Sequence, residues 1–316
     1  MQKLRVAFAG TPEFAIPSFE SLLASNAIEI VTLFTQPDRP VGRGNILTPP
    51  PIKTLAEKNS IPIFQPEKIS TADFKKIPST KVRTDLDFLV VVAFGEILPD
   101  KVLKIPRFGC INLHASLLPQ FRGASPIQSA ILADEQTTGV SFIQISEKLD
   151  SGDIFAKFEI PLAEKNSIEL SHELAKIGGE KFPEILQKIA ANKIFAIPQN
   201  EADITFCQKI KKVDGRVAWR TDSAELLKRK LRAFAVWPGV WTNFIGKVLK
   251  LIEFEVSNQK FEEKKEGSVF EDTGRIFVAT IDGAIELKKV QLAGKQVVPI
   301  AEFVRGNVKF ISAVLG

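Results

Sequence analysis

The segment Phe88-Leu89-Val90-Val91-Val92-Ala93 decides the fold class of this chain. Alternate side chains of a strand point to opposite faces, and here both alternating sets are apolar. A strand that is apolar on both faces is typical of a parallel sheet covered by helices on both sides. We therefore expect a central parallel strand here, within an α/β domain.

The flanking sequence alternates strand-like and helix-like segments, as an α/β domain requires. Leu4–Ala9 is a short apolar run, 17–25 has helical character, and 28–35 is rich in β-branched residues. Further strands are expected at 61–64, 88–93, 111–114 and 139–145, and further helices at 52–59, 126–133 and 168–191. Ligands of such sheets bind at the carboxyl ends of the strands, where candidate site residues should lie.

The second half of the chain has a different pattern. Residues 197–202 carry turn formers without periodicity, so we predict an N-terminal domain over 1–196, a linker over 197–208 and a C-terminal domain over 209–316. One basic helix is expected at 223–235, followed by short strands at 241–244, 248–256, 267–270, 276–280 and 284–291. This pattern indicates an OB-like β-barrel, a fold that can bind nucleic acid. Trp219, Trp237 and Trp241 are expected in the barrel core.

Composition excludes several classes of protein. Of 316 residues, 45% are hydrophobic and 25% charged, which excludes a disordered tail protein, a fibrous repeat and a disulfide scaffold. No apolar stretch reaches the ~18 residues of a membrane span, and the N-terminus lacks a signal-cleavage pattern. We expect a cytoplasmic protein without membrane contact, in which Cys110 and Cys207 are buried thiols.

Charge is unevenly distributed along the chain. Residues 205–316 contain 20 Lys and Arg against 13 Asp and Glu, whereas residues 1–204 contain 22 against 24. A basic second half is expected either to bind a polyanion, with nucleic acid the first candidate, or to be a solvated basic surface. Charge alone leaves both interpretations open.

Common cofactor motifs are absent from the sequence. The turn Gly10-Thr11-Pro12-Glu13 has one glycine where a dinucleotide fingerprint needs three, and there is no phosphate-binding GxxxxGK(S/T) motif. There is no CxxC pair, and the two histidines, His114 and His172, are far apart. We therefore expect no metal site. His172 lies in a charged helical pattern and is expected at the surface.

Polar residues that could carry chemistry cluster after the predicted strand 111–114. Asn112 and His114 share one face of that strand, where Asn can donate to a developing oxyanion and His can move a proton. They could equally satisfy loop backbone. In the later loop Asp150-Ser151-Gly152-Asp153, either carboxylate could orient His114, or the loop could be an ordinary turn.

A third feature is the Pro/Gly-rich loop over 36–45, which contains Arg39, Arg43 and one acid. Such a loop could contact a phosphate backbone, or it could simply connect two elements. Lys209, Lys211 and Lys212 form a further basic group at the start of the second half.

Together these segments resemble methionyl-tRNA formyltransferases over nearly the whole chain. The matching segments, in the family's order, are Phe8-Ala9-Gly10-Thr11-Pro12, Gln36-Pro37-Asp38-Arg39-Pro40 with Gly42-Arg43-Gly44, Asn112-Leu113-His114 with Ser116-Leu117-Leu118-Pro119 and Arg122-Gly123, Leu149-Asp150-Ser151-Gly152-Asp153, Lys209-Ile210-Lys211-Lys212, and Arg232-Ala233-Phe234 with Trp237-Pro238. Their common order and spacing make the resemblance specific.

The resemblance implies a Rossmann-like formyltransferase domain with a mostly parallel sheet, followed by an OB-like tRNA-binding domain. It implies transfer of a formyl group from 10-formyltetrahydrofolate to the α-amino group of methionyl initiator tRNA, in translation initiation. Asn112 and His114 would bind the oxyanion or its proton, and Asp150 would orient His114 and relay the proton. Neither a metal nor a covalent enzyme intermediate is required, and a monomer is expected.

The resemblance also implies two sets of binding residues. Folate would contact the strand end with Phe94, Gly95, Ile97 and Leu98, and the segment Ser116, Leu117, Leu118 and Pro119. The tRNA would contact Arg39, Arg43, Lys209 and Lys212. This sequence departs from the family at Phe94, where Tyr is usual, at Lys148, where Gly is common, and at Ser146, where Met is common.

Two alternatives remain open at this level. An N-formyltransferase acting on an amino sugar nucleotide would share the Asn, His and Asp set, although the arginine loop and the basic second half argue against it. A non-catalytic tRNA-binding relative would bind tRNA and not folate.

Overall fold

The computed structural model describes residues 2–42, 44–77, 86–257, 259, 261 and 264–316. The chain divides into two compact units. The first comprises Met1–Pro126, Thr137–Pro161 and Ser171–Cys207, and the second comprises Ile127–Gln136, Leu162–Leu170 and Gln208–Gly316. In the described part of the chain, no helix is both long and apolar enough to cross a membrane.

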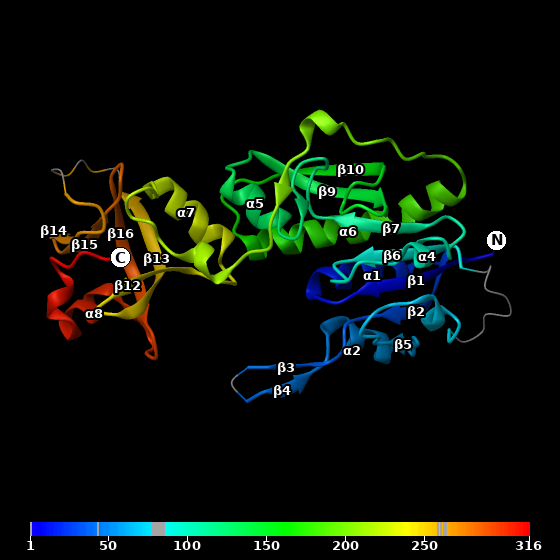
Figure 1. Ribbon diagram of the computed structural model, residues 1–316, viewed down its shortest axis with the longest axis horizontal. Coiled ribbons are helices and arrows are strands. Elements are labelled where there is room, and N and C mark those ends of the chain that lie inside the picture. Colours follow the sequence, from blue (N-terminus) through cyan, green and yellow to red (C-terminus); the bar gives the residue numbers. More distant parts are fainter. Residues whose placement is uncertain (1, 43, 78–85, 258, 260, 262–263) are drawn as a thin grey trace. The chain divides into compact units, whose positions relative to one another are not determined.

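The first unit contains a seven-stranded sheet with the order β10-β9-β7-β6-β1-β2-β5 (Figure 1). The strands from β5 to β7 are parallel, whereas β9 and β10 run antiparallel at one edge. Their bounds are β1 (Leu4–Gly10), β2 (Ile28–Phe34), β5 (Ile63–Phe64), β6 (Phe88–Val92), β7 (Cys110–His114), β9 (Thr137–Gln144) and β10 (Ile154–Pro161). The expected mostly parallel sheet is confirmed.

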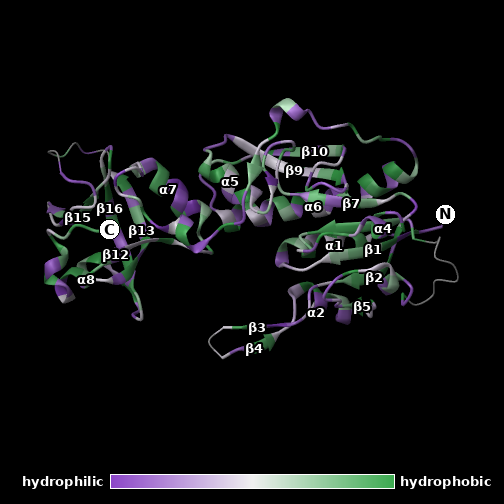
Figure 2. Ribbon diagram, viewed as in Figure 1, coloured by the Kyte–Doolittle hydropathy of each residue, from purple (hydrophilic) through white to green (hydrophobic). Residues whose placement is uncertain are grey.

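The strand β6 lies between β1 and β7, and all five of its residues are buried. The apolar pattern at 88–93 therefore predicted a central strand correctly. The edge strand β10 was not predicted, because its side chains are mostly half-buried or exposed and show no clean alternation. Figure 2 shows hydrophobic residues along the central strands of this sheet.

Four of the described helices in residues 1–196 lie at or near the ranges that the sequence predicted, whereas the two short helices Thr71–Phe74 and Asp100–Leu103 were not predicted. The described helices are α1 (Ile16–Ala24), α2 (Pro51–Lys58), α3 (Thr71–Phe74), α4 (Asp100–Leu103), α5 (Pro126–Leu132) and α6 (Ser167–Ala190). Aromatic rings join two of them to the sheet: Phe8 packs edge-to-face on Phe19 of α1, and Phe142 on Phe182 of α6, with ring centroids 5.1 and 4.9 Å apart. Burial of each such ring stabilises the fold by ~1.5–3 kcal/mol.

The segment predicted as an irregular arginine-containing loop is a two-stranded antiparallel ribbon. It consists of β3 (Arg39–Val41) and β4 (Ile46–Thr48), which pair only with each other among the described residues. Gly42 and Asn45 have φ of 73° and 48°, the left-handed conformation that lets the chain reverse here. The prediction of an irregular loop was wrong because three-residue strands give no periodic signal.

The second unit contains an antiparallel sheet with the order β12-β13-β16-β15-β14, and β17 pairs with β16. Its elements are α7 (Ala224–Ala233), β12 (Val240–Phe244), β13 (Lys247–Ser257), β14 (Val269–Asp272), β15 (Arg275–Ala279), β16 (Ala284–Leu292), β17 (Val297–Pro299) and α8 (Ile300–Gly306). No ladder joins β12 to β14 among the described residues, as in a partly open OB-like barrel. The sequence did not predict β17 and α8.

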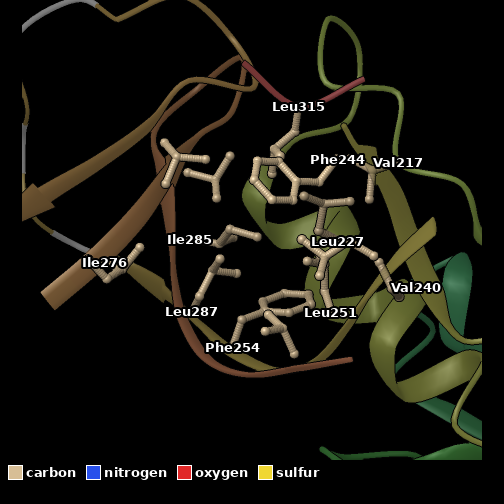
Figure 3. Packing of buried hydrophobic residues seen from close by; sticks show 14 of the residues in the cluster. Val217, Leu227, Val240, Phe244, Leu251, Phe254, Ile276, Ile285, Leu287 and Leu315 are labelled. Atoms are coloured by element: carbon tan, nitrogen blue, oxygen red, sulfur yellow. The ribbon is translucent and has the colours of Figure 1, made fainter. Parts of the chain in front are cut away.

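The core of this unit lies between the sheet and α7 (Figure 3). Leu227 of α7 and Leu251, Phe254 and Leu287 of the strands point toward one another there. Ser223 accepts a hydrogen bond from Leu226 N and so caps α7 at the predicted start. Trp219 is buried as predicted, but Trp237 is 51% exposed, because it lies in the turn between α7 and β12.

Candidate active site

The end of β7 positions two polar side chains. Asn112 and His114 lie on the same face of the strand, opposite Ile143 and Ser141 of β9. His114 is buried, and its Nε2 donates a hydrogen bond to the carbonyl oxygen of Phe121 at 3.0 Å. Because a carbonyl oxygen can only accept, Nε2 carries the proton, and Nδ1 is the nitrogen that can gain or lose one.

The carboxylate of Asp150 faces that nitrogen. Its Oδ2 is 3.6 Å from Nδ1 of His114 and accepts a hydrogen bond of 2.9 Å from Gly123 N. Its Oδ1 has no hydrogen-bond donor among the residues that the structure describes. The structure therefore brings Asp150 and His114 together, whereas the side chain of Asp153, the other candidate, is exposed and makes no hydrogen bond or ion pair with the described residues.

The sequence of the Asp150 loop explains its position. Asp150 has φ of 48°, a conformation that Asp tolerates better than most residues and that turns the chain after β9. A Cβ on Gly152 would lie 1.6 Å from the carbonyl oxygen of Gln144, so only glycine fits this close approach. The loop is packed tightly against the end of the strand that precedes it.

Asn112 differs from His114 in its contacts. Its side chain is half-buried, and its amide makes no hydrogen bond to any of the residues described. The alternative that both residues satisfy loop backbone therefore holds for His114 alone. The Asn112 amide is free to donate to a bound oxygen.

Backbone groups of the site were missed by sequence reasoning. The carbonyl of Phe121 and the amide of Gly123 contact His114 and Asp150, and Phe121 has φ of 57°. The pair β8 (Arg122–Gly123) and β11 (Phe206–Cys207) holds this turn, and a Cβ on Gly123 would lie 2.1 Å from the Cys207 carbonyl oxygen. Two-residue strands leave no periodicity from which they could be predicted.

The residues expected to contact folate have unequal exposure. Ile97 is 85% exposed and Gly95 has φ of 87°, whereas Phe94 and Leu98 are buried in the core beside Val91. Leu117 and Pro119 are half-buried. Ser116 and Leu118 are fully buried, and Ser116 Oγ donates to the carbonyl oxygen of Gln120 at 2.6 Å.

Lys148 lies two residues before Asp150, at the start of the same loop. Its side chain is exposed. Its φ is not in the left-handed region, so the backbone at this position does not require glycine. Its carbonyl oxygen accepts hydrogen bonds from the hydroxyls of Ser146 and Ser151 at 3.3 and 3.0 Å.

Of the residues expected to contact tRNA, Arg39 lies on β3, is exposed, and donates from Nη2 to Gln36 Oε1 at 3.2 Å. Arg43 lies outside the described residues. Asp38 anchors the base of the β3–β4 ribbon: it accepts from Gln65 Nε2 at 2.7 Å and pairs with Lys53 Nζ at 2.8 Å. The hydrogen bond from Gln65 and the ammonium of Lys53 lower the pKa of the Asp38 carboxyl.

The other two residues expected at the tRNA, Lys209 and Lys212, are exposed in the second unit. The Lys212 carbonyl accepts a hydrogen bond of 3.1 Å from Trp241 Nε1, which fixes the backbone of this basic turn.

Cys207 lies beside this site, because its Sγ donates to the carbonyl oxygen of Phe121 at 3.3 Å. His172 is exposed and both cysteines are buried thiols, as expected, and burial raises the pKa of Cys110 to about 12. Across the residues described, no three His, Cys, Asp or Glu side chains gather in a group that could hold a metal ion.

Comparison with known proteins identifies the family. Residues 3–186 match the formyl transferase family, and residues 209–308 match the formyl transferase C-terminal domain. The methionyl-tRNA formyltransferase of Methylococcus capsulatus is 38% identical over 96% of this chain and 97% of its own length. That of Staphylococcus epidermidis is 36% identical over 96% of each chain. The chain belongs to the methionyl-tRNA formyltransferase family.

Solved structures share the fold of this family member at low sequence identity. The sugar 3N-formyl transferase WlaRD is 18% identical with a TM-score of 0.67, over 94% of this chain and 100% of its own. HypX from Aquifex aeolicus, solved with tetrahydrofolic acid, is 17% identical with a TM-score of 0.61, over 98% of this chain and 48% of its own. Formyl transferases of this family use formyl-tetrahydrofolate donors.

Proposed function

We propose that this protein transfers the formyl group of 10-formyltetrahydrofolate to the α-amino group of methionyl initiator tRNA. The observation that carries the proposal is the geometry at the end of β7. The Asn112 amide, which has no hydrogen-bond partner in the described part of the chain, lies on the same face as His114, whose Nδ1 faces the Asp150 carboxylate at 3.6 Å. Family membership supplies the substrates, since the curated relatives are named for this reaction.

The reaction needs little activation of the nucleophile. A free α-amino group has a pKa of about 7.7–8.0, so a useful fraction is neutral near pH 7. Its attack on the formyl carbon moves negative charge onto the formyl oxygen. Asn112 Nδ2 and a protonated His114 Nδ1 are the donors that would stabilise this charge, and buried donors fixed in advance act most strongly.

Asp150 completes the proton transfer. The new amide bond forms as the amine loses one proton, and the bond from the formyl carbon to N10 of the donor breaks as that nitrogen gains one. Oδ2 of Asp150 is held by Gly123 N, which leaves Oδ1 to accept and return the proton. His114 stays oriented throughout through its Nε2 bond to Phe121 O.

The residues near the site fit a flat, partly apolar donor substrate. The apolar side chains of Ile97 and Leu149 are 85% and 63% exposed. We propose that folate contacts Ile97 and the backbone of Phe94 and Gly95, together with the segment Ser116–Pro119. Because the side chains of Phe94 and Leu118 are buried, they would not contact the ligand themselves. Their packing would fix the backbone that contacts it.

We further propose that residues 1–196 form the catalytic domain, that 197–208 link it to the second domain, and that 209–316 form the tRNA-binding domain. Arg39, Lys209 and Lys212 are exposed cations suited to phosphate contacts, which would make affinity fall with salt. The β3–β4 ribbon adds exposed Val41, Ile46 and Leu47, and apolar side chains can wedge against bases. The protein would act as a monomer in the cytoplasm, where charged tRNA is used.

The test is formyl transfer by the purified protein. Mixed with 10-formyltetrahydrofolate and methionine-charged initiator tRNA, it should produce formyl-methionyl-tRNA, and His114→Ala should abolish turnover. Turnover on an amino sugar nucleotide and none on the tRNA would replace the proposal with a sugar formyltransferase. Salt-sensitive tRNA binding without turnover or folate binding would replace it with a non-catalytic tRNA-binding protein.

A further inference from the structure

A side chain from outside the catalytic set joins the two loops of the active site. Gln199 lies beyond α6, and its Nε2 donates to the carbonyl oxygens of Asp150 and Gly152 at 2.9 and 2.7 Å. Its Oε1 accepts from Nε and Nη2 of Arg122 at 2.9 and 2.7 Å. Both amide protons and the amide oxygen are thus used, which makes this a fully satisfied connection between the Asp150 loop and the turn that carries Gly123.

The chemistry of its partners fixes the orientation of the Gln199 amide. Carbonyl oxygens only accept and a guanidinium only donates, so a flipped amide would place donors against donors and acceptors against acceptors. The backbone on either side is also held. Ile197 and Ile154 exchange two hydrogen bonds of 2.9 Å, and the Asn200 side chain caps the short 3-10 helix Glu201–Asp203.

The connection bears on the two groups that position the Asp150 carboxylate. Asp150 is held at φ of 48°, and its carbonyl is one of the two that Gln199 binds. Gly123, whose amide donates to Oδ2 of Asp150, directly follows Arg122, which Gln199 also binds. Arg122 is buried and pairs with no carboxylate among the described residues, so its charge rests on Gln199 Oε1.

We propose that Gln199 is a positioning residue for the transfer reaction, acting through Asp150. Its amide nitrogen holds the Asp150 loop in the conformation that places the carboxylate beside His114, and its amide oxygen neutralises the burial cost of Arg122. This proposal rests on the proposed function, because its kinetic consequence is a slower formyl transfer. Its structural consequence can be measured without any turnover.

Gln199→Glu separates the two halves of this role. The carboxylate keeps the contact to Arg122 and strengthens it, so stability should not fall. It cannot donate to the carbonyls of Asp150 and Gly152, and it repels them. We expect kcat to fall about 10- to 100-fold, as for a catalytic group displaced by about 1 Å. KM for tRNA should change by less than about threefold, since a displaced catalytic group acts mainly on the transition state.

The matched control is Asn200→Asp. It makes the same amide-to-carboxylate change at the next residue, whose exposed side chain hydrogen-bonds only to Ala202 and Asp203 among the described residues. An Asp at this position can still accept from Ala202 N and cap Glu201–Asp203. This variant should keep wild-type kcat. A second test repeats Gln199→Glu in an Asp150→Ala background, where it should cost almost nothing further if Gln199 acts through Asp150.

A readout independent of turnover is the hydrogen exchange of the Gly123 amide, which is protected by Oδ2 of Asp150. The Gly123 amide should exchange faster in Gln199→Glu, and its exchange rate in Asn200→Asp should equal that of the wild type. A wild-type kcat, an equal loss in the Asp150→Ala background, or an unchanged Gly123 amide would each overturn the proposal. If the wild-type protein transfers no formyl group, the proposed function fails, and Gly123 exchange alone decides whether Gln199 holds the loop.

Discussion

The Asp150 loop and the β3–β4 ribbon are both expected to meet a substrate, yet they are built in opposite ways. The loop is fixed by backbone contact: Gly152 lies against Gln144, and Gln199 binds two loop carbonyls. In the described part of the ribbon, Asp38 at its base binds Gln65 and Lys53, while Ile46 and Leu47 are 71% and 63% exposed. The difference indicates that groups that move protons need a fixed position, whereas a surface for a large flexible substrate needs reach.

The largest effect is expected from removing the charge at the fixed loop. In Asp150→Asn, the amide oxygen can still accept from Gly123, so the shape of the site is kept, but the proton acceptor is lost. General acid–base groups contribute about 10²–10⁴-fold, and kcat should fall by about 10³ with little change in the melting temperature.

The matched control for that variant is Asp153→Asn, which changes the same charge at an exposed position three residues along the loop. It should transfer formyl groups at the wild-type rate. If both variants lose activity equally, the charge of the loop matters and the contact of Asp150 with His114 does not.

The next effect is expected from the backbone of the same loop. In Gly152→Ala, the new Cβ would meet the Gln144 carbonyl oxygen at 1.6 Å, so the loop must move. We expect kcat to fall about 10- to 100-fold and the free energy of unfolding to fall by about 1–3 kcal/mol. Gly283→Ala is the control, since no atom lies within 4 Å of its added Cβ. Wild-type kinetics for Gly152→Ala would mean that the loop need not be fixed.

The ribbon should respond in the opposite sense. Leu47→Ser removes an exposed apolar side chain, so KM for tRNA should rise about 3- to 10-fold, by analogy with the loss of one stacking contact, while kcat at saturating tRNA is unchanged. Stability should not change, because the side chain packs on little. Phe195→Ser, at another exposed apolar side chain of the first unit, should leave both constants unchanged. A fall in kcat for Leu47→Ser would show that the ribbon also positions the reacting groups.

The same contrast separates what the sequence could predict from what it could not. Burial on both faces of β6, and the alternation that places Asn112 with His114, are local patterns, and both were predicted. Contacts such as Phe121 O with His114, or Gln199 with the Asp150 loop, join residues 7 and 49 positions apart through backbone atoms. A side-chain pattern carries no signal for them. The predictions of a loop at 36–45 and of a buried Trp237 were wrong for a related reason. Short strands and turn residues give no periodic pattern in the sequence.

The smallest effect concerns the anchor of the ribbon. The hydrogen bond from Gln65 and the ammonium of Lys53 lower the pKa of Asp38 from its ordinary value of 3.8. A carboxyl with a lowered pKa in the folded state keeps its contribution above the ordinary value and loses it as the pH falls through the folded value. The ribbon should therefore stay anchored at any pH above 3.8 and loosen only below it.

Lys53→Met tests the anchor at neutral pH. It removes one of the two partners of Asp38, so the amides of β3 and β4 should exchange with deuterium a few-fold faster, and the loosening should begin at higher pH. Lys58→Met, at the exposed end of the same helix, should change neither property. Because the ribbon is proposed to bind and not to react, Lys53→Met should raise KM for tRNA slightly and leave kcat unchanged. Equal exchange rates in both variants would mean that the pairing of β3 with β4, and not the contact of Asp38 with Lys53, keeps the ribbon ordered.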